Sequence, residues 1–187
     1  MIRADHSFRF AFGLFLFLSV SAAPAQEPVA RRYPIPDHGR IELRVPESWK
    51  DDLRQPPNRL PPTIAFSPKS GRPFEVLLTV GWTTTQDRRI PGSREMEQAV
   101  QRQAEGIKPK AVEQRIEVKE LKGPSASGYY FSATDRAPAP GEYKYLTQGI
   151  LRVADLVVAF SILTNDGQAR TVSDALELLR NAAHLNN

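Results

Sequence analysis

The segment from residue 156 to residue 163, LVVAFSIL, constrains the fold more than any other part of this chain. It holds no charge, and its apolar residues do not alternate with polar ones as they do in a strand with one wet face. It is far shorter than the roughly 20 residues that a membrane-spanning helix needs. Its Val, Ile and Phe residues favour a strand. We therefore interpret it as an interior strand covered on both faces.

Two helical patterns are candidates for these covers. In residues 93–106 the apolar residues fall on one helical face, and Ser93 is suited to cap the first turn. This face holds Met96, Ala99, Val100 and Ile107. Residues 168–184 follow an NDG turn, and their stripe holds Ala169, Val172, Leu176, Leu179 and Ala183. A helix on each face of an antiparallel sheet predicts an α+β fold, a three-layer α/β/α sandwich.

The other predicted strands complete this sheet. Residues 40–46 alternate between apolar and polar, and residues 63–67 and 74–82 form a hairpin around PKSGRP. Three further strands are expected, at 112–121 on the outside of the sheet, at 128–135 and at 143–153. The order is strand, hairpin, helix, four strands, helix, in a sheet of about six to seven strands. The proline-rich stretch 47–62 is expected to be irregular, with Trp49 in the core.

The N-terminal residues have the layout of a secretory signal peptide. Arg3 and Arg9 precede the apolar run FAFGLFLFLSVSAA, and small residues follow at Ala23 and Ala25. We expect cleavage after Ala25, a flexible leader at 26–39, and a single domain at 40–187. The localisation that follows is periplasmic or secreted, by export in a Gram-negative bacterium, with no transmembrane segment after cleavage.

The inventory of reactive side chains predicts no enzyme. The chain has no cysteine, which excludes disulfides and thiolate metal sites. After cleavage only His38 and His184 remain as histidines, and we expect both at the surface, outside any Ser-His-Asp arrangement. The acid pairs Asp51 with Asp52 and Asp166 with Asp174 lack the spacing of a calcium loop. No catalytic residue, metal site or cofactor is predicted.

Two groups of residues are candidates for binding. A basic rim of Arg88, Arg89, Arg94, Lys108 and Lys110 would suit an anionic partner, but Glu95, Glu97, Glu105 and Glu113 are interleaved with it. Interleaved charges favour a solvated, ion-paired surface. The second group is aromatic: Trp82 ends a strand, and Tyr143 and Tyr145 begin another. The predicted binding residues are Trp82, Arg88, Arg89, Tyr143 and Tyr145. Packing under the helices is the alternative for Tyr145 and Trp82, and it is favoured for Trp82. The net charge of +4 is too small to favour a nucleic-acid partner.

Three stretches carry a resemblance to a known fold: VPESW, GYYFSATD with YLTQGIL, and VVAFSILTNDG before the last helix. With the element order, they resemble the PsbP-like fold from about Arg40 to His184. This fold is shared by PsbP of photosystem II, the MOG-type nuclear import factor of yeast and bacterial envelope proteins of the DcrB and DUF1795 kind. The resemblance implies an exported, non-enzymatic accessory protein that docks on an envelope protein. The alternative is a module that binds a small ligand or metal ion in a pocket between sheet and helix.

Overall fold

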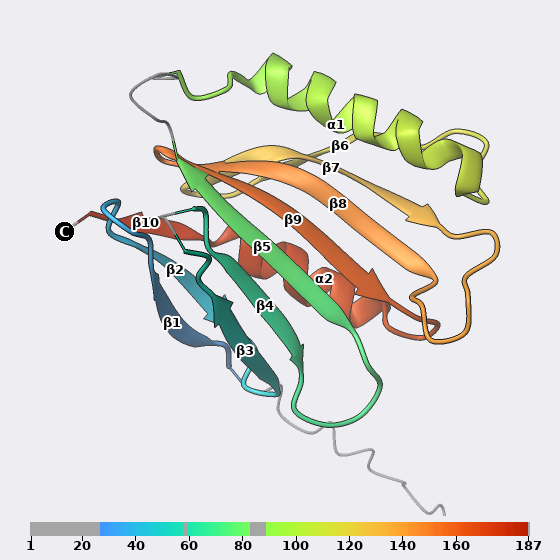
Figure 1. Ribbon diagram of the computed structural model, residues 1–187, viewed down its shortest axis with the longest axis horizontal. Coiled ribbons are helices and arrows are strands. Elements are labelled where there is room, and N and C mark those ends of the chain that lie inside the picture. The colour runs from blue at the N-terminus through green and yellow to red at the C-terminus, as the bar shows by residue number, and fades with distance from the viewer. Residues whose placement is uncertain (1–26, 58–59, 83–88, 187) are drawn as a thin grey trace, which may run out of the picture.

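The computed structural model describes residues 27–57, 60–82 and 89–186. Seven antiparallel strands form a large sheet in the order β3-β4-β5-β9-β8-β7-β6, and three form a small sheet in the order β1-β2-β10 (Figure 1). The strands are β1 (Val29–Pro34), β2 (Arg40–Val45), β3 (Trp49–Arg54), β4 (Thr63–Pro68), β5 (Glu75–Trp82), β6 (Lys119–Lys122), β7 (Ala126–Thr134), β8 (Tyr145–Val153), β9 (Leu156–Thr164) and β10 (Ala183–Leu185). The helices are α1 (Ser93–Ile107) and α2 (Ala169–Arg180), with a short 3-10 turn at Lys108–Lys110.

The large sheet is the middle of three layers (Figure 1). On one side, here called the front face, α1 packs on β7 and β8. On the opposite side, the back face, α2 contacts β9, β7 and β6, and it also contacts β2 of the small sheet. The predicted α+β sandwich with a helix on each side of an antiparallel sheet is confirmed.

The main hydrophobic core lies on the back face. Strand alternation turns Phe66, Leu78 and Phe160 to this side, where all three are buried. Apolar side chains of β2 and α2, among them Leu43 and Leu179, close the core from the other side. Trp49 belongs to the same core, as predicted, with 4% of its surface exposed.

The strand that opened the sequence analysis is confirmed as an interior strand, because β9 lies between β5 and β8. Its back-facing residues, from Leu156 to Thr164, are all buried. On the front, however, Ala159 is exposed and its neighbours Val157 and Ser161 are only half-buried. The prediction of complete cover on both faces is therefore wrong for the front face, since α1 packs on β7 and β8 instead.

Two strands lie where irregular chain was expected. Residues 29–34 form β1, so the flexible leader predicted at 26–39 is wrong there. β1 pairs with the whole of β2, from Val29 opposite Val45 to Pro34 opposite Arg40, which orders the segment. Residues 49–54 form β3 at the edge of the large sheet, because the prolines of this region flank the strand rather than interrupt it.

The ends of both helices also differ from the prediction. Gly92, not Ser93, is the N-cap of α1, and its N–H donates to the Glu95 carboxylate, 2.8 Å away. The Ser93 hydroxyl bonds instead with that of Tyr129, at 2.7 Å. Helix α2 ends at Arg180 rather than at His184, because Ala183–Leu185 leave the helix and pair with β2 as β10.

The outer strand predicted at 112–121 is shorter than expected. Residues 112–118 form turns and irregular chain, and only Lys119–Lys122 pair with β7. Val112, the apolar first residue of the predicted strand, is 56% exposed. The alternation of apolar and charged residues in this segment is typical of a strand, but only the four residues Lys119–Lys122 pair with a neighbouring strand.

None of the helices in the described part of the chain is long and apolar enough to span a membrane. The expected signal peptide at 1–25 lies outside the described residues. Export therefore stays a prediction from the sequence.

Candidate functional site

The predicted aromatic residues do not form one patch. Trp82 pairs with Leu156 at one end of β9, and Tyr145 pairs with Thr164 at the other. Eight residue steps along a strand separate these ends by roughly 26 Å. Trp82 stacks on His38, with the ring centroids 4.8 Å apart, and packs against the main core. Its role in binding stays a prediction.

Tyr145 belongs to a polar cluster beside the start of α2. Its hydroxyl donates to Asp166 at 2.6 Å, and the Lys144 ammonium donates to both Asp166 oxygens, at 3.0 and 3.2 Å. These side-chain hydrogen bonds hold the pKa of Asp166 below its usual range. Tyr143 lies near Glu75, and burial followed by the charge of Glu75 raises its pKa. Arg89 lies in the segment before α1, and Arg88 lies outside the described residues.

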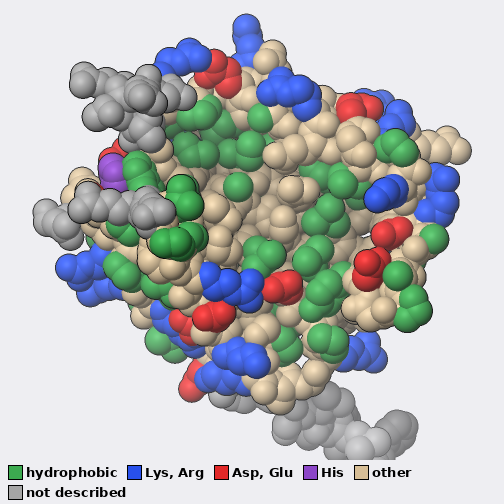
Figure 2. Space-filling view, viewed as in Figure 1, with side chains coloured by type: hydrophobic (Ala, Val, Ile, Leu, Met, Phe, Trp, Pro, Cys, Tyr) green, Lys and Arg blue, Asp and Glu red, His purple; other side chains and the backbone are tan. Residues whose placement is uncertain are grey.

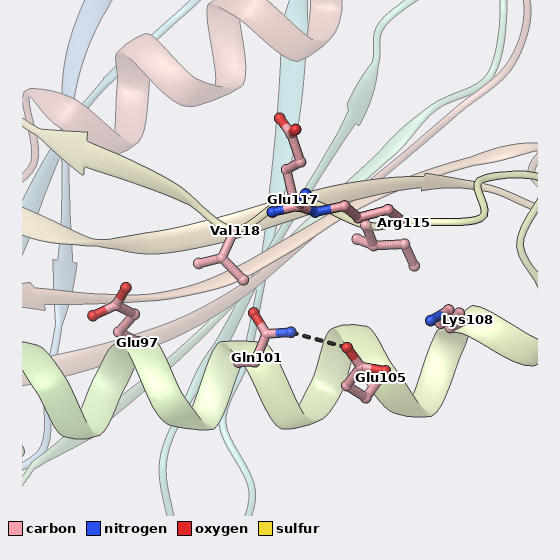
Figure 3. A pocket seen from close by; sticks show the side chains of 8 residues that line it. Glu97, Gln101, Glu105, Lys108, Arg115, Glu117 and Val118 are labelled. Atoms are coloured by element: carbon pink, nitrogen blue, oxygen red, sulfur yellow. Dashed lines mark hydrogen bonds between the residues drawn. The ribbon is translucent and has the colours of Figure 1, made fainter.

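The basic rim is at least partly neutralised. Arg89 forms an ion pair with Glu95 at the start of α1, as the solvated interpretation expects. Between α1 and residues 115–118 lies a groove of about 340 Å³. Figure 3 shows acidic and basic side chains of both elements around this groove, with Gln101 donating to Glu105 at 3.0 Å. The mixture of signs gives the groove no preference for an anionic or a cationic ligand.

His184 is buried, so the expectation that it lies at the surface is wrong. Only 2% of its side chain is exposed, and its Nδ1 is 2.5 Å from a carboxylate oxygen of Asp155. Its Nε2 lies 2.6 Å from the carbonyl oxygen of His38. The two contacts of the His184 ring therefore connect β10 to the turn between β1 and β2, at His38, and to the turn between β8 and β9, at Asp155. Within the described ranges, no group of three His, Asp or Glu side chains is placed to hold a metal ion.

The least covered part of the sheet is the front of β5 and β9. Eight residues of β5 and β9 face the front, and Glu75 lies at the end of β5. We call the other seven the open face: Leu77, Thr79, Gly81, Val157, Ala159, Ser161 and Leu163. Thr79 and Ala159 face each other across the strands and are both exposed, whereas the back-facing Leu78 and Phe160 are buried. None of the seven carries a charge, unlike the polar side that an antiparallel sheet usually turns to water.

Charged side chains border the open face instead of crossing it. Figure 2 shows apolar and uncharged atoms over much of the middle of this view, with most of the Lys, Arg, Asp and Glu side chains toward the outside. On the β3 side, Arg54 donates to Asp52 at 3.0 Å and lies 3.9 Å from Glu75. Arg54 thereby links β3 to β5 above the small residue Ala65, which is buried.

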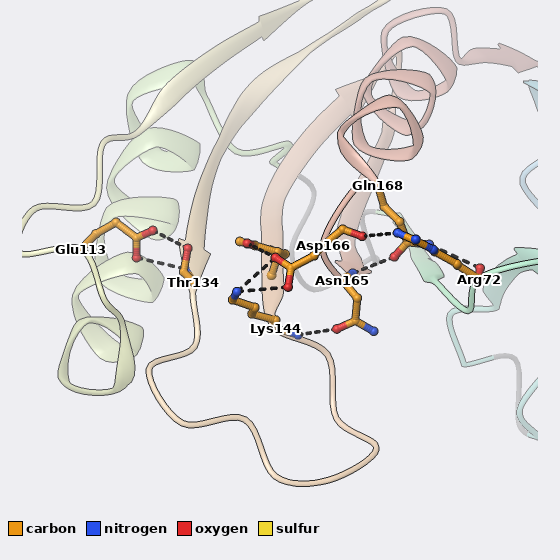
Figure 4. Close-up of polar contacts among 8 residues, drawn as sticks. Arg72, Glu113, Thr134, Lys144, Asn165, Asp166 and Gln168 are labelled. Atoms are coloured by element: carbon orange, nitrogen blue, oxygen red, sulfur yellow. Dashed lines mark hydrogen bonds and ion pairs between the residues drawn. The ribbon is translucent and has the colours of Figure 1, made fainter.

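A second candidate lies on the back face. Where β7, β8 and β9 meet the first turns of α2, a pocket of about 390 Å³ remains. Figure 4 shows part of its polar surroundings: Glu113 accepts two hydrogen bonds from Thr134, and Gln168 donates to the carbonyl of Arg72. The Gln168 side chain fixes the start of α2 through these bonds and through the N–H of Asn165. No local motif marks this pocket, because its residues come from four separate segments of the chain.

Comparisons with known proteins establish the fold. No family model matches this chain, and no curated protein matches it. Among solved structures, the chain is similar to the solution structure of cyanobacterial PsbP, CyanoP, from Synechocystis sp. PCC 6803. The similarity covers 89% of this chain and 99% of CyanoP, with a TM-score of 0.53 and 9% sequence identity. The class defined is thus the PsbP-like fold, as predicted; the narrower resemblance to DcrB and DUF1795 proteins stays a prediction.

Proposed function

We propose that this protein is an exported, non-enzymatic accessory protein that docks on an envelope protein through the open face. The observation that carries the proposal is the uncharged open face with a charged border. The core of a protein interface is depleted of charge, and its rim is polar. Export rests on the N-terminal sequence pattern, and the PsbP-like fold is compatible with an accessory role.

The small side chains of the open face suit a close approach. At the centre, Thr79 and Ala159 leave the sheet surface shallow, and Leu77 and Leu163 are only half-buried beside them. A partner with an apolar surface would remove these leucines from water, which contributes about 25 cal/mol per Å² of apolar surface buried. No backbone rearrangement of the sheet is needed for this contact.

The test is affinity purification from cross-linked cells of the source organism. Ala159→Arg places a long cation at the centre of the open face, whereas Ala30→Arg makes the same change at an exposed position of β1. We expect one envelope protein to co-purify with the wild type and with Ala30→Arg, and to be lost with Ala159→Arg. Equal recovery with Ala159→Arg would contradict docking through the open face.

A separate assay tests the non-enzymatic part of the proposal. The purified chain is expected to be inactive across a broad panel of hydrolase substrates. Turnover that a single acidic or serine substitution abolishes would contradict this part without affecting the docking result.

A further inference from the structure

The back-face pocket has the features of a ligand site, and it lies on the side of the sheet opposite the open face. Strands β7, β8 and β9 and the start of α2 line it, together with Glu113. A volume of about 390 Å³ is within the range of small-molecule sites in proteins. The lining residues are Glu113, Ser132, Ala133, Thr134, Tyr145, Leu146, Thr147, Thr164, Asn165, Gly167, Gln168, Ala169 and Val172.

The back face changes its chemistry at this pocket. Along β9 the back-facing residues are apolar from Leu156 to Ile162, and then Thr164 follows. Along β8 the back-facing Val153 and Leu151 are buried, whereas Thr147 and Tyr145 follow at the pocket end. Along β8 and β9, hydroxyl groups therefore occur on the back face only where the pocket lies.

Two of these hydroxyls are deeply buried. Thr147 is 4% exposed and Thr164 is 2% exposed. A buried hydroxyl costs free energy unless it forms a hydrogen bond, and valine has the same shape without that cost. Thr147 bonds with the Ser132 hydroxyl, at 2.8 Å. Thr164 lines the same pocket.

The charge of the lining selects against anions. Glu113 is the one charged residue among those that line the pocket. Burial acts to raise its pKa, but the hydrogen bonds from the N–H and hydroxyl of Thr134, at 2.9 and 2.7 Å, outweigh burial and lower it. Glu113 is therefore a carboxylate near neutral pH, and its remaining lone pairs can accept hydrogen bonds from ligand hydroxyls.

The remaining lining is mixed. Ala169 and Val172 of α2 offer aliphatic contact, and Tyr145 offers a ring whose hydroxyl is already held by Asp166. Aliphatic surface, hydroxyls and one carboxylate match the chemistry of a carbohydrate, which presents C–H faces and a rim of hydroxyl groups. We propose that this pocket binds a neutral saccharide the size of a mono- or disaccharide, with Thr164 and Glu113 bonding its hydroxyls.

Isothermal titration tests this proposal on the chain from residue 26, with glucose, mannose, N-acetylglucosamine, trehalose and maltose as probes. Glucuronate and glucosamine serve as anionic and cationic counterparts. An immobilised glycan array distinguishes a free sugar from the end of a longer glycan. We expect at least one neutral sugar to bind with a defined stoichiometry, either free or as a chain end on the array.

Two variants locate the binding. Thr164→Val removes the hydroxyl without a change of shape and should weaken affinity about tenfold, because a lost hydrogen bond of this kind is worth about that factor. Ala169→Phe adds a ring at an exposed position that lines the pocket and should abolish binding. Thr79→Val, the same change on the open face, is the matched control. Its melting temperature and that of Thr164→Val verify folding.

The outcomes are decisive. Absence of binding by every neutral probe, or binding of glucuronate or glucosamine alone, would overturn the proposal. Wild-type affinity in both Thr164→Val and Ala169→Phe would overturn the location. Because Ala159→Arg tests docking on the opposite face, each of the two proposals can fail without the other.

Discussion

The front and back faces of β5 and β9 differ in how far their side chains are buried, although the same two strands form both faces. On the back, Leu78 and Phe160 are buried under α2 and the small sheet; on the front, their chain neighbours Thr79 and Ala159 are exposed. Strand alternation separates the two sets of side chains completely. The back face can therefore be selected for stability while the front face is selected for contact.

The large expected effects lie on the back face. Phe66→Ala should lower the free energy of unfolding by about 3–5 kcal/mol, since it removes a fully buried ring and leaves a cavity. Leu77→Ala, on the front, should cost much less because its side chain is only half-buried. Urea denaturation of both variants checks the difference, and equal losses would break the comparison between the faces.

Next in size is the close contact between the β6–β7 turn and α2. A Cβ added at Gly123 would lie 1.8 Å from the carbonyl oxygen of Arg180, so Gly123→Ala should cost about 1–3 kcal/mol through overpacking. At Gly106 in α1 an added Cβ meets nothing within 4 Å. Gly106→Ala should therefore stabilise the protein by about 0.4–1 kcal/mol, because alanine has less freedom in the unfolded chain. Thermal unfolding should show opposite signs for the two variants.

The pH dependence of the free energy of unfolding tests the contribution of Glu113 on the back face. Its folded pKa lies below the ordinary value of 4.5, so it stabilises the fold above its unfolded pKa. This contribution is lost as the pH falls through the folded pKa. Glu113→Gln should therefore show a shallower loss of stability below pH 4.5 than the wild type. A slope unchanged in Glu113→Gln would contradict the role of the Thr134 hydrogen bonds.

The smallest expected effect is at the centre of the open face. Ala159→Arg and Thr79→Arg should change the free energy of unfolding by no more than about 0.5 kcal/mol, as is usual for exposed positions. Chemical denaturation measures this directly. A loss as large as that of Phe66→Ala would show that the open face supports the fold, and it would remove the distinction between the faces.

Local patterns predicted most of the strands but not where each helix lies. Alternation and turn residues were enough for β2, the β4–β5 hairpin and the antiparallel run from β7 to β9. The missed strands, β1 and β3, are rich in charge and lack an apolar alternation, and they are ordered by pairing along their whole length with β2 and β4. LVVAFSIL lacked alternation because Ala159 and Val157 are uncharged on the front, and apolar composition alone did not distinguish a covered face from an uncovered one.

The candidate sites were harder to predict than the fold. The opposition of Thr79 and Ala159 depends on the register between β5 and β9, which lie far apart in the sequence. In the same way, the sequence does not distinguish Thr147 and Thr164 from other strand residues. Both are buried beside α2 only once the sheet and the helix have packed together. Tyr143, Tyr145 and Trp82 were chosen for their chemistry at strand ends, and the fold places these ends apart.

Site-specific photo-cross-linking in living cells tests the central claim most directly. A photoreactive amino acid at Ala159 reports contacts of the open face, and the same amino acid at Ala30 reports an exposed strand away from it. We predict an adduct to one envelope protein from Ala159 and none from Ala30. The same adduct from Ala30, with none from Ala159, would contradict docking through the open face.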